Sequence, residues 1–225
     1  MTKQSNNLLE LPTKIIAIIA HEDDETSCGG LLAKNVRLGG ESHVICFGGS
    51  TDLRFREFEE SCKILGVTFE LLRKKETRFD EDYSETIDKL SDIIIDKQPE
   101  FVITHRADGD YHRDHRVVSS IARESCIKAH VRKNRHDVKG ILYTETMSLH
   151  PVVSIFIDIT EEYDKVYKAL KKHISQIEKL EDYYLQELDA LTRLRGVQAG
   201  CERAEALFFE PLPLVSALNR RILGV

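Results

Sequence analysis

Two short groups of ionisable residues carry the side chains best suited to catalysis in this sequence. The first, HEDDE at 21–25, directly follows an apolar run at 14–19, and the second, HRDH at 112–115, comes soon after another apolar run at 101–104. Histidine and aspartate supply the nitrogen and oxygen ligands of catalytic zinc sites. We therefore expect a metal site if the fold brings the two groups together.

A catalytic zinc ion needs three protein ligands and an open position for water. His21 and Asp24 lie three residues apart in a loop at the end of a predicted strand, so both side chains can reach one ion. His115, from the second group, is the third expected ligand. This set predicts one zinc ion per chain.

Three further residues of these groups can take part in the chemistry. Asp23 lies beside the expected ion without being needed as a ligand, so its carboxylate can accept a proton from water as general base. His112 can donate a hydrogen bond to a developing oxyanion from the other side of the substrate. Asp114 is placed to orient an imidazole. We assign these three residues catalytic roles.

The elements that must position these residues alternate between strand and helix. The sequence predicts strands at 15–20, 43–47, 68–72, 101–104, 141–146 and 152–159 and helices at about 26–38, 53–65, 84–97, 116–129 and 160–173, followed by a helix-rich segment at 174–195. This order is typical of an α/β fold: a Rossmann-like, doubly wound, mostly parallel sheet with helices on both faces and a helical C-terminal segment. In the order 3-2-1-4-5, strands one and four are neighbours, and a crevice opens at their carboxyl ends. Both His/Asp groups follow those two strands.

Composition restricts the class of protein. The chain has 225 residues, 41% of them hydrophobic, and a net charge of −6, so we expect one domain over 1–225 with a loose lead-in at 1–12. The acidic balance disfavours nucleic-acid binding, and the apolar run before His21 is too short to cross a membrane. Five widely spaced cysteines indicate reduced thiols and a cytoplasmic protein.

The order of short motifs along the chain resembles that of the PIG-L/LmbE-like N-acetylglucosamine deacetylases. The first group with Gly29-Gly30 is similar to the family's A-H-P-D-D-E...GG motif, and 104–115 is similar to its second motif, which ends in H-P-D-H. Weaker matches are the R-x-x-E...LGV segment at 54–67, the Ser-Gln pair at 175–176, and R-G...G...A-E-A at 195–206. Two departures are clear: Glu22 and Arg113 stand where the family has proline.

The resemblance implies zinc held by His21, Asp24 and His115, with Asp23 as general base. It also implies that His112, supported by Asp114, stabilises the tetrahedral intermediate. The implied reaction removes the N-acetyl group from an amino sugar or its conjugate and releases acetate and a free amine. The substitutions of proline by Glu22 and Arg113 leave the implied site residues unchanged. They change the stiffness of both loops, and Arg113 adds a positive charge at the mouth of the expected crevice.

Substrate recognition is less closely defined by the sequence. Asp52 and Arg54, after the second strand, and Tyr111, in the second loop, are candidate sugar-binding residues because a hexose needs polar partners near the crevice. A metal-dependent phosphoesterase and a non-catalytic sugar- or nucleotide-binding module are the alternative functions. The particular substrate and the oligomeric state are left open, with the charged C-terminal helices as a candidate interface for a homo-oligomer.

Overall fold

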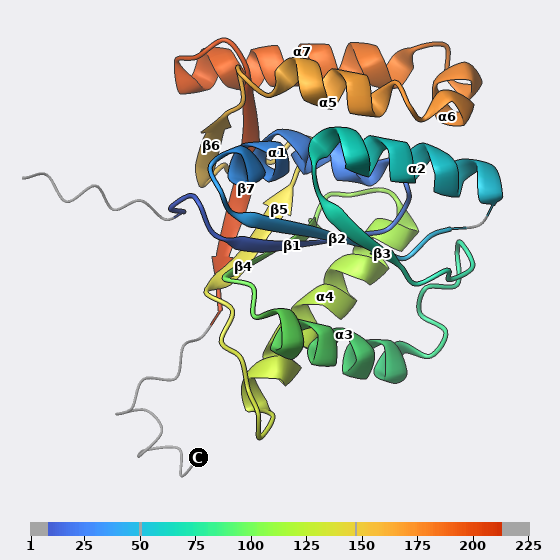
Figure 1. Ribbon diagram of the computed structural model, residues 1–225, viewed down its shortest axis with the longest axis vertical. Coiled ribbons are helices and arrows are strands. Elements are labelled where there is room, and N and C mark those ends of the chain that lie inside the picture. The colour runs from blue at the N-terminus through green and yellow to red at the C-terminus, as the bar shows by residue number, and fades with distance from the viewer. Residues whose placement is uncertain (1–8, 50, 147, 213–225) are drawn as a thin grey trace, which may run out of the picture.

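A seven-stranded, mostly parallel sheet lies at the centre of the molecule. The computed structural model describes residues 9–49, 51–146 and 148–212. Strands follow the order β3-β2-β1-β4-β5-β7-β6 (Figure 1). The first five pair in parallel in the predicted order, whereas β7 is antiparallel to both of its neighbours. The strands are β1 (Lys14–Ile19), β2 (Glu41–Cys46), β3 (Thr68–Leu71), β4 (Phe101–His105), β5 (Gly140–Thr144), β6 (Ile155–Asp158) and β7 (Ala204–Pro211).

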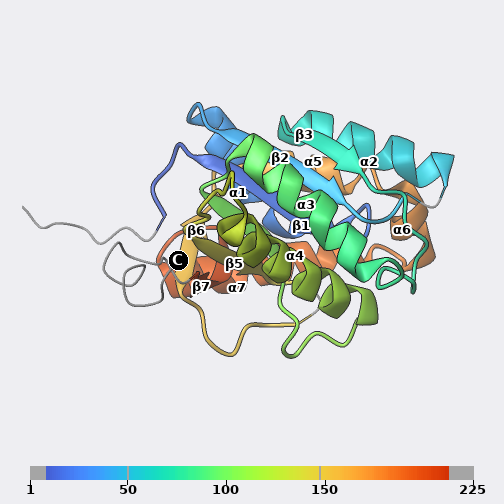
Figure 2. The same ribbon diagram turned by 90° about the horizontal axis from the view of Figure 1, so that it is seen from below.

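Helices cover both faces of the sheet, as the sequence predicted. One face carries α1 and α2, with α5, α6 and α7 forming a further layer outside them (Figure 1). The opposite face carries α3 and α4, which pack against each other (Figure 2). The helices are α1 (Gly29–Arg37), α2 (Asp52–Leu65), α3 (Tyr83–Lys97), α4 (Arg113–Val131), α5 (Tyr163–Leu170), α6 (Ile174–Lys179) and α7 (Tyr183–Ala199), and the 3-10 helix η1 (Asp24–Cys28) precedes α1.

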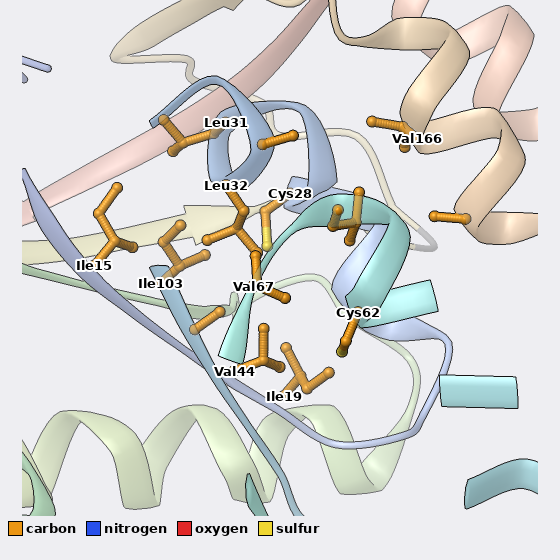
Figure 3. Close-up of a cluster of buried hydrophobic side chains, with 14 of the residues drawn as sticks. Ile15, Ile19, Cys28, Leu31, Leu32, Val44, Cys62, Val67, Ile103 and Val166 are labelled. Carbon is orange, nitrogen blue, oxygen red and sulfur yellow. The ribbon is translucent and has the colours of Figure 1, made fainter. Parts of the chain in front are cut away.

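The strand that leads to the first His/Asp group is buried on both faces. Ile15, Ala17 and Ile19 of β1 pack into a cluster with α1, α2 and α5 (Figure 3). Ile16 and Ile18 point the other way, into the cluster beneath α3 and α4. Each fully buried aliphatic side chain contributes about 1.5–3 kcal/mol. The end of β1 is therefore a rigid base for the residues that follow it.

The helix that carries the second group begins earlier than the sequence predicted. We expected it at 116–129, with 112–115 in a loop, but α4 starts at Arg113. The reason is a local cap: the His112 side chain accepts a hydrogen bond from the backbone N–H of Asp114, whose carboxylate lies in the first turn. The second group therefore occupies a helix N-terminus rather than a free loop.

Two predictions for the C-terminal third were also inaccurate. The helix expected from Thr160 begins at Tyr163, because the Thr160 hydroxyl donates to Asp158 Oδ1 (2.6 Å) and does not cap the helix. The strand expected at 152–159 is shorter, Ile155–Asp158. Strand β7 was not predicted as a strand, although it lies between β5 and β6.

The described part of the chain also bears on two other expectations. None of its helices is long and apolar enough to cross a membrane. All five cysteines are free, and four of them are buried. Most of the predicted lead-in, residues 1–8, and the tail at 213–225 lie outside the described residues.

Candidate metal centre and active site

The loop after β1 folds back so that Asp24 lies beside His21. The Asp24 amide donates to the His21 carbonyl (3.3 Å), and the His21 amide donates to Asp24 Oδ2 (2.7 Å). The second group approaches from the start of α4, because β1 and β4 are neighbours in the sheet. The His21 and His115 rings consequently lie 5.3 Å apart, centroid to centroid.

Three donor groups lie at distances that suit one small cation. Asp24 Oδ2 lies 3.4 Å from His21 Nδ1, and Asp24 Oδ1 lies 3.4 Å from His115 Nε2. Donor atoms on a tetrahedral zinc ion with bonds of about 2.0–2.1 Å are separated by about 3.3 Å. The residues that the sequence proposed as ligands thus meet around the Asp24 carboxylate. Among the described residues, the groups of three donors within 4.8 Å of one another are His21, His112 and His115, and Asp24, His105 and His115. The proposed set combines members of both groups, and its nitrogen and oxygen donors are of the types that zinc binds.

Each histidine of this set is held by a second carboxylate on its other nitrogen. His115 Nδ1 lies 2.8 Å from Asp110 Oδ2, and His21 Nε2 lies 3.4 Å from Asp114 Oδ2. Such carboxylates fix the tautomer and the ring orientation of metal-binding histidines. The Asp114 carboxylate therefore orients His21, whereas we had expected it to support His112. We did not identify Asp110 from the sequence, although an acid five residues before His115 could have indicated a partner for that histidine.

His105 lies next to the site, but the lone pair of its Nε2 atom already accepts a hydrogen bond. Its ring stacks on His115 at 4.0 Å, and with Asp24 it completes a second arrangement of closely spaced donors. However, His105 Nε2 accepts a hydrogen bond from the Ala20 amide (2.9 Å), and its side chain is fully buried. We interpret His105 as a structural residue that supports His115.

His112 is also close to the donor set. Its ring centroid lies 4.7 Å from those of His21 and His115, so it belongs to a third possible combination of donors. Because His112 Nδ1 accepts from the Asp114 amide (3.3 Å), the neutral ring carries its hydrogen on Nε2. Burial and the neighbouring histidines lower its pKa. A neutral imidazole that can donate suits an oxyanion partner better than a ligand.

The Asp23 carboxylate is fixed by a guanidinium group. Arg54 donates to Asp23 Oδ1 (2.9 Å) and also contacts Glu22 Oε2 (3.1 Å) and Glu76 Oε1 (3.0 Å). Glu22, the residue that replaces the proline of the resembled motif, is fully buried and accepts from the Gly49 amide (2.9 Å). The first loop is therefore held by an ion-pair network instead of a proline ring.

Charges within the donor set reinforce one another. Burial disfavours the ionised form of Asp24, but the interaction with the charge on His115 holds the pKa of Asp24 well below its usual value. Burial likewise disfavours the His115 cation, yet Asp24 and Asp110 raise the pKa of His115 to about 10. In the metal-free protein the protonated His115 ring and the ionised Asp24 therefore stabilise each other.

A pocket of about 360 Å³ opens onto these residues. His21, Asp23, Asp24, His112 and His115 form one side of it. Of the residues predicted to bind substrate, Arg54 and Tyr111 line the pocket, whereas Asp52 does not and lies exposed at the start of α2. The sequence did not indicate the α6–α7 wall of the pocket, which consists of Gln176, Lys179, Tyr184, Glu187, Leu188 and Leu191.

Residues 16–126 match the family model described as PIG-L, GlcNAc-PI de-N-acetylase. Nearly half of the chain thus matches the PIG-L family. Both His/Asp groups lie within the matched segment. The family contains enzymes, as the names of the relatives below indicate.

A curated relative of this chain is 4-oxalmesaconate hydratase of Pseudomonas putida KT2440, 27% identical over 87% of this chain and 85% of that protein. Among solved structures, 4-carboxy-2-hydroxymuconate hydratase of Pseudomonas putida KT2440 has 24% identity and a TM-score of 0.77, covering 90% of this chain and 98% of its own. N,N'-diacetylchitobiose deacetylase of Pyrococcus horikoshii has 22% identity and a TM-score of 0.76, covering 88% and 84%. These structural likenesses establish the shared fold.

The weaker motifs of the PIG-L resemblance have structural explanations here. Glu205 accepts hydrogen bonds from the backbone N–H groups of Gly30 (2.6 Å) and Leu31 (2.9 Å) at the start of α1, and burial raises its pKa to about 8. Glu57 accepts from the amide and hydroxyl of Ser175, at 2.8 and 2.6 Å. These contacts attach β7 and α6 to the elements around the pocket.

Proposed function

We propose that this chain is a zinc-dependent deacetylase that hydrolyses the N-acetyl group of an N-acetylglucosamine-type amino sugar or its conjugate. The observation that carries the proposal is the donor set of His21, Asp24 and His115 with the Asp23 carboxylate next to it. Bound zinc would polarise the amide carbonyl and acidify a water molecule. Hydrolysis of an amide also needs a proton acceptor and an oxyanion partner, and the pocket offers both.

The protein residues would divide these tasks as follows. Asp23, held by Arg54, accepts the proton of the attacking water and is positioned to pass it to the leaving amine. His112 Nε2–H donates to the oxyanion that forms from the carbonyl oxygen. Asp114 and Asp110 keep the His21 and His115 rings in the orientation that leaves Nδ1 and Nε2 free for the metal.

A second candidate is a hydratase that adds water to an unsaturated polycarboxylic acid. The 27% identity to 4-oxalmesaconate hydratase, over most of both chains, favours it. Hydration of a conjugated double bond could use the same metal and base. A polycarboxylate, however, requires available positive charge. Both arginines of the pocket are already paired with carboxylates, and its lysine, Lys179, is exposed to water.

A two-metal phosphoesterase finds less support. Such sites hold two ions about 3.5–4 Å apart. Among the described residues, the alternative groups of donors all include His115. They therefore describe overlapping positions rather than two separate sites.

Two parallel assays test the proposal. Zinc-loaded and chelator-treated protein are incubated with a panel of N-acetyl amino sugars while free amine and acetate are measured, and 4-oxalmesaconate is tested for loss of its ultraviolet absorbance. We expect metal-dependent release of acetate and amine in equal amounts. Turnover of 4-oxalmesaconate with no release from any N-acetyl sugar would reject the deacetylase in favour of the hydratase.

A further inference from the structure

The α6–α7 wall of the pocket contains an acid whose negative charge no described residue compensates. Glu187 on α7 is half-buried and lines the pocket, yet it forms neither a hydrogen bond nor an ion pair with any described residue. Burial alone raises its pKa. Partial removal of a carboxylate from water is costly unless another group compensates.

The positive charges of the pocket are, in contrast, largely neutralised. Arg54 contacts three carboxylates, as described above. Arg195 is buried and donates through Nε to Glu145 Oε2 (2.8 Å), with a second contact between the same two side chains. Lys179 has no ion-pair partner among the described residues, but it is exposed, so water screens its charge.

Two tyrosines extend the wall around Glu187. Tyr184 lies one helical turn before it on α7, and Tyr111 reaches the same pocket from the loop before α4. Aromatic rings with hydroxyl groups suit the faces and edges of a sugar, and their π-systems also favour a nearby cation. The wall thus offers a half-buried carboxylate flanked by aromatic side chains.

We propose that Glu187 selects substrates that carry a protonated amine in addition to the N-acetyl group, so that the substrate class is an N-acetylated oligosaccharide or glycoside with a second, free amino group. This inference rests on the deacetylase proposed above. The ammonium group is the complement of Glu187: it supplies the missing charge and up to three hydrogen-bond donors. Neutral sugars are weaker ligands, and anionic sugars are disfavoured.

The test compares three disaccharides of similar size, each with one N-acetyl group. They are mono-N-acetylchitobiose, which has an ammonium group, neutral N-acetyllactosamine, and the glucuronate-N-acetylglucosamine disaccharide, which has a carboxylate. Acetate release by zinc-loaded protein is measured at pH 6.5. We expect kcat/KM for the cationic disaccharide to exceed that for the neutral one by about tenfold.

Two variants separate recognition from general damage. Glu187→Gln should remove the tenfold preference by raising KM for the cationic disaccharide, with kcat for that disaccharide retained. Lys179→Gln, which removes a charge of opposite sign from the same wall, should preserve the preference. An equal loss on all three disaccharides in Glu187→Gln, or a wild-type preference for the carboxylate, would overturn the inference.

A binding experiment distinguishes failure of this inference from failure of the proposed reaction. If wild-type protein releases acetate from none of the three disaccharides and from no N-acetyl sugar of the panel above, the deacetylase is rejected, and calorimetric titration with chitobiose and cellobiose then tests Glu187 without any turnover. Tighter binding of the cationic chitobiose, lost in Glu187→Gln, supports the recognition site. Equal binding of both sugars overturns it.

Discussion

Glu22 provides a quantitative test of how the first catalytic loop is held. Its carboxylate is fully buried and contacts both the Gly49 amide and the Arg54 guanidinium. Glu76 contacts the same guanidinium at 3.0 Å, but its side chain is 42% exposed. The two acids therefore differ mainly in burial, and each can be replaced by glutamine with the same change in net charge.

The expected effects follow from that difference in burial. Glu22→Gln retains an acceptor for the Gly49 amide but presents an uncharged amide to Arg54. A buried hydrogen bond to a charged group contributes about 1.5–3 kcal/mol, so the free energy of unfolding should fall by about that amount. An exposed ion pair contributes about 0–1 kcal/mol, so Glu76→Gln should have little effect.

Urea denaturation of chelator-treated proteins measures both values without a contribution from bound metal. The midpoint should fall for Glu22→Gln with an unchanged dependence on urea concentration, whereas the Glu76→Gln curve should nearly overlie that of the wild type. Equal losses in the two variants, or no loss in Glu22→Gln, would refute the argument that Glu22 replaces the proline by fixing the loop through Arg54.

Three further predictions concern the metal site and its support. Asp23→Asn should still bind one zinc ion per chain while turnover falls by about 10²–10⁴-fold, because the general base is lost. In the metal-free protein His115 has a pKa of about 10 and is protonated at pH 7, and the pKa of His21 is also raised, so zinc binding should release at least one proton, and zinc affinity should rise with pH up to about pH 10. Gly30→Ala should lower the free energy of unfolding by about 1–3 kcal/mol, because its Cβ would lie 2.5 Å from Ile159 Cγ2.

Each of these predictions has a direct check. Elemental analysis of Asp23→Asn separates zinc loss from loss of the base, and wild-type turnover in that variant would remove Asp23 from its role. Calorimetric titration with zinc in two buffers of different ionisation enthalpy counts the protons, and a count near zero would contradict the protonated state of His115. Gly29→Ala is the control for Gly30→Ala, because its nearest contact is 3.3 Å; equal destabilisation would show that the close approach is unimportant.

The parallel half of the fold could be predicted because its signals are local. The fully apolar β1 and β4 and the amphipathic helices between them define the strand order, and the order places both His/Asp groups at one crevice. The candidate ligands His21, Asp24 and His115 follow from residue type and that topology. The amino-acid sequence alone is therefore sufficient to predict that these three side chains approach one another.

The remaining features depend on contacts that no local pattern contains. Asp114 faces His21 rather than His112 because α4 begins at the second motif, and its start depends on a side-chain cap. Glu22 looked like a substitution that alters loop stiffness, but its effect depends on Arg54, 32 positions later. Glu187 belongs to a weakly amphipathic helix, so the sequence did not show which of its residues face the pocket.

The attachment of Glu205 to the start of α1 also concerns how the enzyme matures during synthesis. The helix that follows the first catalytic loop takes its N-terminal hydrogen-bond acceptor from a strand 175 residues further along the chain. A ribosome would thus have exposed every candidate metal ligand well before it delivers the side chain that anchors this helix. The nascent protein would acquire its finished catalytic centre only after residue 205 has emerged, so the candidate ligands would be exposed in an incomplete centre while the intervening residues are synthesised.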